Sequence, residues 1–119
     1  MDKLEINQER GASILKVQGD VEGDDGFHLL EIVNNAEEGS LPFWIMDIPE
    51  TQFFDSMALE AILRISRTLR ERKGDIYITS ATPNVQEIFR ITRLQSKFKF
   101  FSNINQALEN LFKGQSGGQ

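Results

Sequence analysis

The amino-acid sequence predicts a single α/β domain, built on a mixed sheet of about five strands with about four helices. Segments with strand patterns alternate with segments of helical periodicity in the order β-β-α-β-α-β-α-β-α, which favours right-handed parallel crossovers. The two leading strands, within residues 4–18, are close enough in sequence to form a hairpin, which adds an antiparallel edge. The strand at 43–48 is almost continuously apolar, which is typical of a strand covered on both faces.

An acidic loop and a helix are predicted between the hairpin and the apolar strand. Residues 19–26 contain three glycines and four acidic residues, which is a loop composition. These acids lack the ligand spacing of an EF-hand, so we expect no metal site. Apolar residues at helical spacing predict a helix over 25–38, with Phe27 in its buried stripe and Gly39 just after its last turn.

The second half of the chain continues the alternation of helix and strand. A helical pattern runs from Ser56 to about residue 72 and ends in cations followed by Gly74, which are both favourable there. The β-branched segment 75–79 predicts a strand. The Thr-Pro pair at 82–83 predicts a helix start, with a hydroxyl cap and a proline at the first helical position.

The remaining elements complete the domain. The third helix has a predicted buried stripe that includes Thr92. Three phenylalanines within 95–101 predict a short last strand, and Asn103 is expected to cap a final helix of regular apolar periodicity. We assign residues 1–113 to the domain and residues 114–119 to a disordered, glycine-rich tail.

The composition argues against several classes of function. The net charge of −5 disfavours general nucleic-acid binding, and the lack of cysteine excludes disulfides and thiolate chemistry. The first residues lack a basic region followed by an apolar stretch, and no apolar run approaches the ~20 residues of a membrane-spanning helix. We therefore expect a cytoplasmic protein that does not insert into a membrane.

The charge is distributed unevenly along the chain. Residues 1–60 contain 14 Asp and Glu against 3 Lys and Arg, whereas residues 61–119 contain 4 against 10. Such asymmetry marks either a surface for a partner or two solvated helix faces that differ in sign.

Catalytic chemistry is not predicted. The chain has a single histidine, His28, and no recognisable base and orienting group for a serine nucleophile. It also lacks a phosphate-binding glycine loop and a nicotinamide-binding fingerprint. We expect no enzyme activity and no cofactor.

The candidate functional site is the join between the apolar strand and the second helix. Asp55 and Ser56 lie there at a helix N-terminus, where several backbone N–H groups lack intrahelical partners and the dipole is positive. Such an end binds a phosphate from outside or tolerates one attached to its own hydroxyl. The alternative is that Asp55 or Ser56 only caps the helix, which both residue types do well.

The sequence around this join is similar to a family motif. The motif is an apolar residue followed by Asp-Ser-Ser-Gly-Leu, and the chain matches it at Asp55, Ser56 and Leu59. It departs from the motif at Met57 and Ala58. Together with the element order, this stretch resembles the STAS domain, as found in bacterial anti-sigma factor antagonists.

Other segments strengthen the resemblance, which covers roughly residues 4–112. Residues 19–22 are similar to the family's loop motif Gly-x-Leu/Ile-Asp, with Glu22 in place of the aspartate. Residues 82–89 are similar to Ser-Pro-x-Val-x-x-x-Phe/Leu, and residues 92–94 stand where Ser-Gly-Leu is common.

The resemblance implies a phosphorylation-switched regulator. In the antagonists, the first serine after the aspartate is phosphorylated by a partner serine kinase and dephosphorylated by a PP2C-like phosphatase. Carried over, unmodified Ser56 permits partner binding and phospho-Ser56 blocks it, in a pathway that controls transcription, motility or biofilm formation. The partners implied are a serine kinase or anti-sigma-like protein and a PP2C-like phosphatase. The partner-binding residues expected on this hypothesis are Asp20, Glu22, Asp55, Ser56, Met57 and Ala58.

A second hypothesis is a constitutive scaffold or small-ligand module without phosphorylation. In this case Ser56 acts only as a helix cap. The altered Met57-Ala58 pair favours it, because these side chains add bulk where the family has Ser-Gly.

Overall fold

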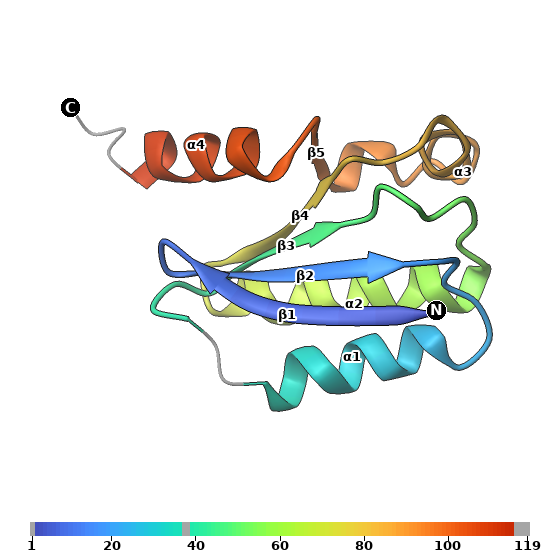
Figure 1. Cartoon of the computed structure of the whole chain (residues 1–119), viewed down its shortest axis with the longest axis horizontal. Helices are drawn as coiled ribbons and strands as arrows, with labels where there is room; N and C mark the ends of the chain where they lie inside the picture. The colour runs from blue at the N-terminus through green and yellow to red at the C-terminus, as the bar shows by residue number, and fades with distance from the viewer. Residues whose placement is uncertain (1, 37–38, 116–119) are drawn as a thin grey trace.

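The computed structural model describes residues 2–36 and 39–115. These residues contain one five-stranded sheet and four α-helices. The strands are β1 (Lys3–Glu9), β2 (Ala12–Gln18), β3 (Phe43–Asp47), β4 (Asp75–Thr79) and β5 (Lys99–Phe101). The helices are α1 (Asp25–Asn35), α2 (Ser56–Glu71), α3 (Pro83–Ile91) and α4 (Ile104–Gln115), and a 3₁₀ turn, η1 (Gln95–Lys97), precedes β5. The predicted α/β class and element order are confirmed (Figure 1).

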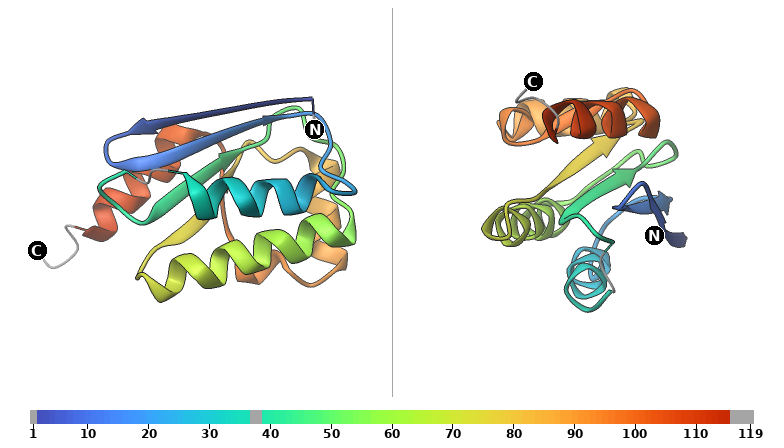
Figure 2. Two further views of the ribbon diagram at one scale, coloured as in Figure 1. Left: turned by 90° about the horizontal axis from the view of Figure 1, so that it is seen from below. Right: turned by 90° about the vertical axis from the view of Figure 1, so that its left-hand side faces the viewer.

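The sheet is mixed and has the strand order β1-β2-β3-β4-β5. β1 pairs antiparallel with β2, and the other neighbouring strands pair in parallel. α1 and α2 lie on one face of the sheet, and α4 lies on the other (Figures 1 and 2). Because parallel strands end at the same edge, the loops after β2, β3 and β4 meet at one end of the molecule.

The continuous apolar sequence of β3 follows from its position in the middle of the sheet. Trp44 and Met46 belong to the core beneath α1 and α2, whereas Ile45 packs in the core beneath α4. All three residues have 0% of their surface exposed. An apolar residue is needed at each of these positions because both faces of the strand are covered.

Small residues allow α1 and α2 to pack closely. A Cβ on Gly26 of α1 would lie 2.9 Å from the carbonyl oxygen of Met57 and 3.2 Å from the Cβ of Ala61 on α2. The start of α1 is therefore held directly against the start of α2.

α1 differs from the predicted helix in its buried face and in its length. Phe27, expected in the buried stripe, is 48% exposed. The buried positions of the helix are instead Gly26, Leu29 and Val33. The helix ends at Asn35, before the predicted Gly39, because Ala36 has an extended backbone with ψ of 150°. Residues 37–38 of the predicted helix lie outside the described residues.

Two local signals are confirmed at helix starts. Thr82 caps α3 by accepting a hydrogen bond from the Val85 N–H at 3.3 Å, with Pro83 at the first helical position. Asn103 caps α4 by accepting a hydrogen bond from the Gln106 N–H at 2.9 Å.

Three features of the C-terminal part differ from the predictions. Thr92 is exposed rather than buried, since α3 ends before it and its hydroxyl donates to the Ile88 carbonyl at 2.7 Å. Only the last three residues of the predicted strand at 95–101 form β5, because η1 takes the preceding turn. α4 runs to Gln115, into the segment predicted as tail, and residues 116–119 lie outside the described part of the chain.

Gly74 follows α2 as predicted. A glycine is needed here because the backbone of Pro42 approaches it closely, and not because of its own backbone angle. The left-handed position belongs to Lys73, with φ of 65°, and the Gly74 N–H then donates to the Leu69 carbonyl at 2.8 Å. A Cβ on Gly74 would lie only 1.6 Å from the carbonyl oxygen of Pro42, just before β3.

We predict that Gly74→Ala lowers the free energy of unfolding by about 2 kcal/mol or more, because its methyl group overlaps a backbone atom. The matched control is Gly23→Ala, at an exposed loop position with φ of +61° and no atom within 4 Å of the new Cβ. This control costs only its backbone strain, about 1 kcal/mol. Urea denaturation measures both, and equal losses would contradict the role given to Gly74.

Candidate functional site

Ser56 is the first residue of α2 and is exposed. The cap of the helix is Asp55, whose backbone is extended and whose Oδ1 accepts a hydrogen bond from the Ala58 N–H at 2.9 Å. The hypothesis that Ser56 acts as the cap is therefore wrong. The capping role requires a residue outside the helix, and Ser56 already has helical geometry.

The second oxygen of Asp55 ties the helix start to the acidic loop. Its Oδ2 accepts a hydrogen bond from the Gly23 N–H at 2.7 Å. The side chain is half-buried and thus has both oxygens engaged within the protein. Asp55 thus holds together the corner, by which we mean the start of α2 and the acidic loop that lies against it. The neighbouring residue Ser56 remains on the surface.

Asp20 ties the same two loops together at a second point. Its Oδ1 accepts hydrogen bonds from the Gln52 N–H at 2.9 Å and the Phe53 N–H at 3.2 Å. Between these ties, Val21 and Phe54 form an isolated parallel bridge. The loop after β2 and the loop after β3 therefore continue the parallel pairing by one bridge beyond the ends of the strands.

Ala58 does not belong to the exposed site. It has 0% of its surface exposed, and its Cα lies 3.0 Å from the position of a Cβ on Gly26. Its methyl group fills the contact between α1 and α2, so it adds no bulk to the surface beside Ser56. A direct contact between this side chain and a partner, as expected from the sequence, is not compatible with its burial.

Three large apolar side chains are exposed on the segments that form the start of α2 and the start of α1, which packs against it. Met57 is 40% exposed, Phe53 is 45% exposed and Phe27 is 48% exposed. Phe53 and Met57 flank the Asp55-Ser56 pair in sequence, and Phe27 follows Gly26, which touches the backbone of Met57. We call the exposed set Glu22, Phe27, Phe53, Ser56 and Met57 the Ser56 surface.

Sequence reasoning misses Phe27 and Phe53. Phe27 shares the apolar periodicity of α1, which predicts a place in the core, and Phe53 reads only as part of the connection to α2. A useful signal is that large apolar side chains lie within three residues of Ser56 on both sides, in a segment predicted to be a corner.

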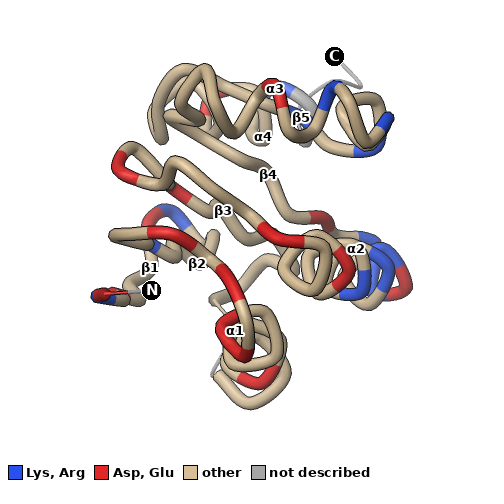
Figure 3. Tube along the Cα trace, turned by 90° about the vertical axis from the view of Figure 1, so that its right-hand side faces the viewer, with Lys and Arg blue, Asp and Glu red and all other residues tan. Residues whose placement is uncertain are grey.

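The surroundings of the Ser56 surface are acidic. A shallow cleft of about 420 Å³ beside it is lined by Asp2, Gly19, Asp20, Glu22, Glu50 and Gln52. Figure 3 views this end of the molecule, where acidic residues mark the loops and basic residues gather on the outer side of α2. Within residues 2–36 and 39–115, no group of three His, Cys, Asp or Glu side chains is arranged to hold a metal ion.

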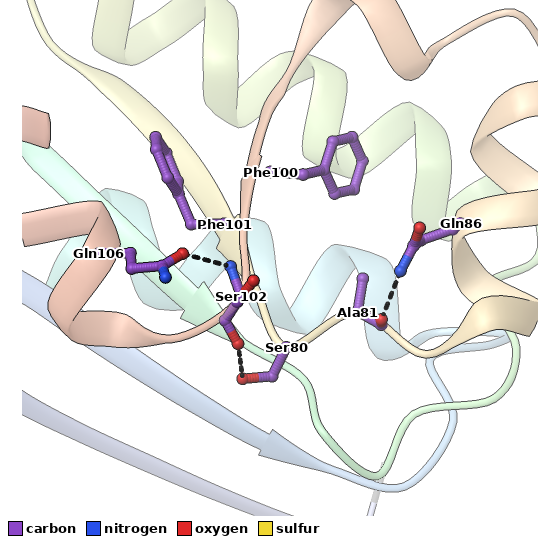
Figure 4. A pocket seen from close by; sticks show the side chains of 7 residues that line it. All are labelled: Ser80, Ala81, Gln86, Phe100, Phe101, Ser102 and Gln106. Atoms are coloured by element: carbon purple, nitrogen blue, oxygen red, sulfur yellow. Dashed lines mark hydrogen bonds between the residues drawn. The ribbon is translucent and has the colours of Figure 1, made fainter.

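A second cavity, of about 480 Å³, lies at the ends of β4 and β5 (Figure 4). Its lining is uncharged and consists of Ser80, Ala81, Gln86, Phe100, Phe101, Ser102 and Gln106. The polar groups bond one another: Ser80 Oγ donates to the Ser102 carbonyl at 3.3 Å, and Gln106 accepts from the Ser102 N–H at 3.3 Å. This lining contains no titratable group for acid–base chemistry.

The comparison with protein families agrees with this geometry. The sequence model described as the STAS domain matches residues 3–107. The chain belongs to the STAS domain family. The resemblance stated from the motifs is thereby confirmed.

Relatives of this STAS domain include proteins described as anti-sigma factor antagonists. BtrV of Bordetella bronchiseptica, a candidate antagonist, is 25% identical over 112 residues, which cover 93% of this chain and 95% of BtrV. A candidate antagonist from Thermotoga maritima superposes with a TM-score of 0.80 at 15% identity, covering 90% of this chain and 92% of that one.

The antagonist SpoIIAA is similar in two solved forms. Unphosphorylated SpoIIAA superposes with a TM-score of 0.76 at 15% identity and covers 92% of this chain and 96% of its own. Phosphorylated SpoIIAA from Bacillus superposes with a TM-score of 0.69 at 14% identity and covers 92% and 99%. At these identities the likeness concerns the fold. In the described part of this STAS domain, no helix has the length and apolar character to cross a membrane.

We predict that Asp55→Ala lowers the free energy of unfolding by about 2 kcal/mol, because the cap and the bond to Gly23 are lost together. Ser56→Ala, one residue along the chain, is the control and changes this energy by less than about 0.5 kcal/mol. Chemical denaturation of both variants tests the assignment. A larger loss for Ser56→Ala would mean that the serine has the structural role.

Proposed function

We propose that this STAS domain is a phosphorylation-switched, protein-binding regulator that resembles an anti-sigma factor antagonist. Unmodified Ser56 permits a partner to bind, and phospho-Ser56 blocks it. The observation that carries the proposal is an exposed serine hydroxyl at a helix N-terminus whose cap is supplied by another residue. The solved structures of SpoIIAA in a phosphorylated and an unphosphorylated form support the same chemistry for a domain of this fold.

The folded domain tolerates a phosphate at Ser56. The hydroxyl lies on the surface, and the ties between the loops use Asp20, Asp55 and backbone groups instead. The positive end of the α2 dipole offsets part of the added charge. Phosphorylation therefore alters the surface and leaves the packing beneath it in place.

The effect on a partner is electrostatic and steric. A phosphate adds about −1.5 to −2 charges to a surface whose apolar anchors available for contact are the exposed Phe27, Phe53 and Met57. Burying such a charge against an apolar or acidic partner surface costs several kcal/mol. The partner surface is therefore expected to be apolar where it covers Ser56, with basic groups only at the margin, opposite the exposed Glu22.

The partners proposed are a serine kinase of the anti-sigma type, which binds and modifies Ser56, and a PP2C-like phosphatase, which restores it. In this proposal the domain is a cytoplasmic protein that needs no cofactor and catalyses no reaction. The pathway that it regulates controls transcription, motility or biofilm formation. The acidic end supports a protein partner over nucleic acid, since phosphate backbones require a basic surface. The descriptions of BtrV and SpoIIAA as antagonists support this assignment.

We predict that Ser56→Asp weakens partner binding by about tenfold or more, whereas Ser56→Ala binds like the unmodified parent. Ser96→Asp adds the same charge at an exposed position in η1 and serves as the matched control, with no loss of binding expected. Pull-downs from native cells, with quantification of the captured kinase, measure the effect. Equal capture by all four proteins would support a constitutive scaffold instead.

We also predict that Met57→Glu reduces partner capture about tenfold or more, because a charge replaces an apolar anchor. Ile91→Glu is the control, since Ile91 is 61% exposed on α3 and outside the Ser56 surface. The thermal midpoint of both variants should stay near that of the parent. If Ile91→Glu abolished capture and Met57→Glu did not, the partner surface would lie elsewhere.

A further inference from the structure

β1 is an edge strand whose outer side is open. It lies at one end of the sheet and pairs only with β2, and no other described element lies beyond it (Figure 2). All of its residues are exposed except Leu4, which is half-buried. In such a strand, alternate backbone N–H and C=O groups point away from the sheet, which makes it a template for another strand.

The strand lacks two of the common devices that protect an edge. Its register with β2 is continuous from Lys3 opposite Gln18 to Glu9 opposite Ala12, with no bulge, and it contains no proline. Ile6, at its centre, is 44% exposed. The remaining protection is its charged side chains, so the arrangement of these charges decides what can pair with it.

We propose that β1 pairs antiparallel with β1 of a second copy, about a two-fold axis that passes through Ile6. In this register Ile6 faces Ile6 of the second copy. Lys3 faces Glu9 at both ends of the interface, and Glu5 faces the neutral Asn7. The pairing uses all seven residues of β1 and places two opposite-charge pairs around a central apolar pair.

The charges oppose the neighbouring registers. Centring the pairing on Glu5 places Glu5 directly against Glu5. Centring it on Asn7 places Glu5 against Glu9 twice. Like charges directly opposite each other are destabilising, so both of these registers are disfavoured. The charges of β1 therefore select the register centred on Ile6.

The dimer keeps both Ser56 surfaces open. The start of β1 lies beside the end of β2, as the bond from the Asp2 N–H to the Gln18 carbonyl at 2.9 Å indicates. The Ser56 surface extends from that same end of β2. Antiparallel pairing therefore directs the two surfaces to opposite ends of one continuous sheet. The pairing is independent of the proposed function, and it presents two sites to a partner that is itself multivalent.

Sedimentation equilibrium over a series of concentrations tests the pairing. The parent should approach twice the monomer mass at high concentration. Lys3→Glu and Glu9→Lys should each raise the dissociation constant about tenfold or more, because each creates two like-charge pairs. An equimolar mixture of these two variants should recover the dimer. The introduced glutamate of one chain then faces the introduced lysine of the other, and the native Glu9 of the first faces the native Lys3 of the second.

Glu109→Lys, on the exposed side of α4, is the control for net charge and should dimerise like the parent. A parent that remains monomeric throughout the concentration series would overturn the proposal. Dimers that persist equally in Lys3→Glu and Glu9→Lys would overturn it as well, since the interface would then lie elsewhere.

A cysteine probe tests the register itself, and the chain contains no native cysteine. Ile6→Cys places two thiols opposite each other at the axis, within the range of a disulfide for facing residues of antiparallel strands. Mild oxidation should convert it to a covalent dimer. Ile91→Cys, which is also exposed, should form far less. Equal yields from both variants would show random collision and would contradict the pairing.

Discussion

The candidate site depends on the two hydrogen bonds that the Asp55 carboxylate accepts. One oxygen caps α2 through the Ala58 N–H, and the other holds the Gly23 N–H of the acidic loop. A single side chain thereby fixes where the helix begins and how the loop after β2 lies against it. Ser56 becomes the first helical residue and needs no bond of its own to keep the corner in shape, so its hydroxyl is available for modification.

Close packing and a second set of hydrogen bonds hold the loops and helices beneath Ser56 together. Gly26 and Ala58 bring α1 and α2 into backbone contact, and Asp20 adds a second tie between the loops after β2 and β3. A surface built this way has few ways to rearrange when a charge is added. Of the two departures from the family motif, Ala58 is buried in the contact between α1 and α2. Only Met57 changes the exposed surface.

Much of the fold is predictable because its signals are local. The apolar run of β3, the Thr82-Pro83 helix start and the Asn103 cap depend on neighbours in sequence. The prediction for Phe27 is wrong because periodicity cannot tell that Gly26 takes the position against α2. The purpose of Gly74 depends on Pro42, a residue distant in sequence. In the site, the motif locates Asp55 and Ser56, but the burial of Ala58 and the tie made by Asp20 arise from contacts between loops, which the sequence does not encode locally.

The same contacts determine how far the effect of the proposed phosphate on Ser56 extends. If the phosphate broke a bond that holds the corner, its effect would spread through the fold, and any partner of the domain would sense it. The bonds of the corner use Asp20, Asp55 and the backbone, so the effect stays within the reach of the charge itself. Screening limits that reach to about 8 Å at physiological salt. A partner that contacts Phe53 and Met57 falls within this range, whereas a strand paired along β1 has its centre at Ile6, midway along an edge that leads away from the corner. If both proposals hold, the surface that phosphorylation switches is distinct from the centre of the edge that pairs, and the domain can change one set of contacts while it retains the other.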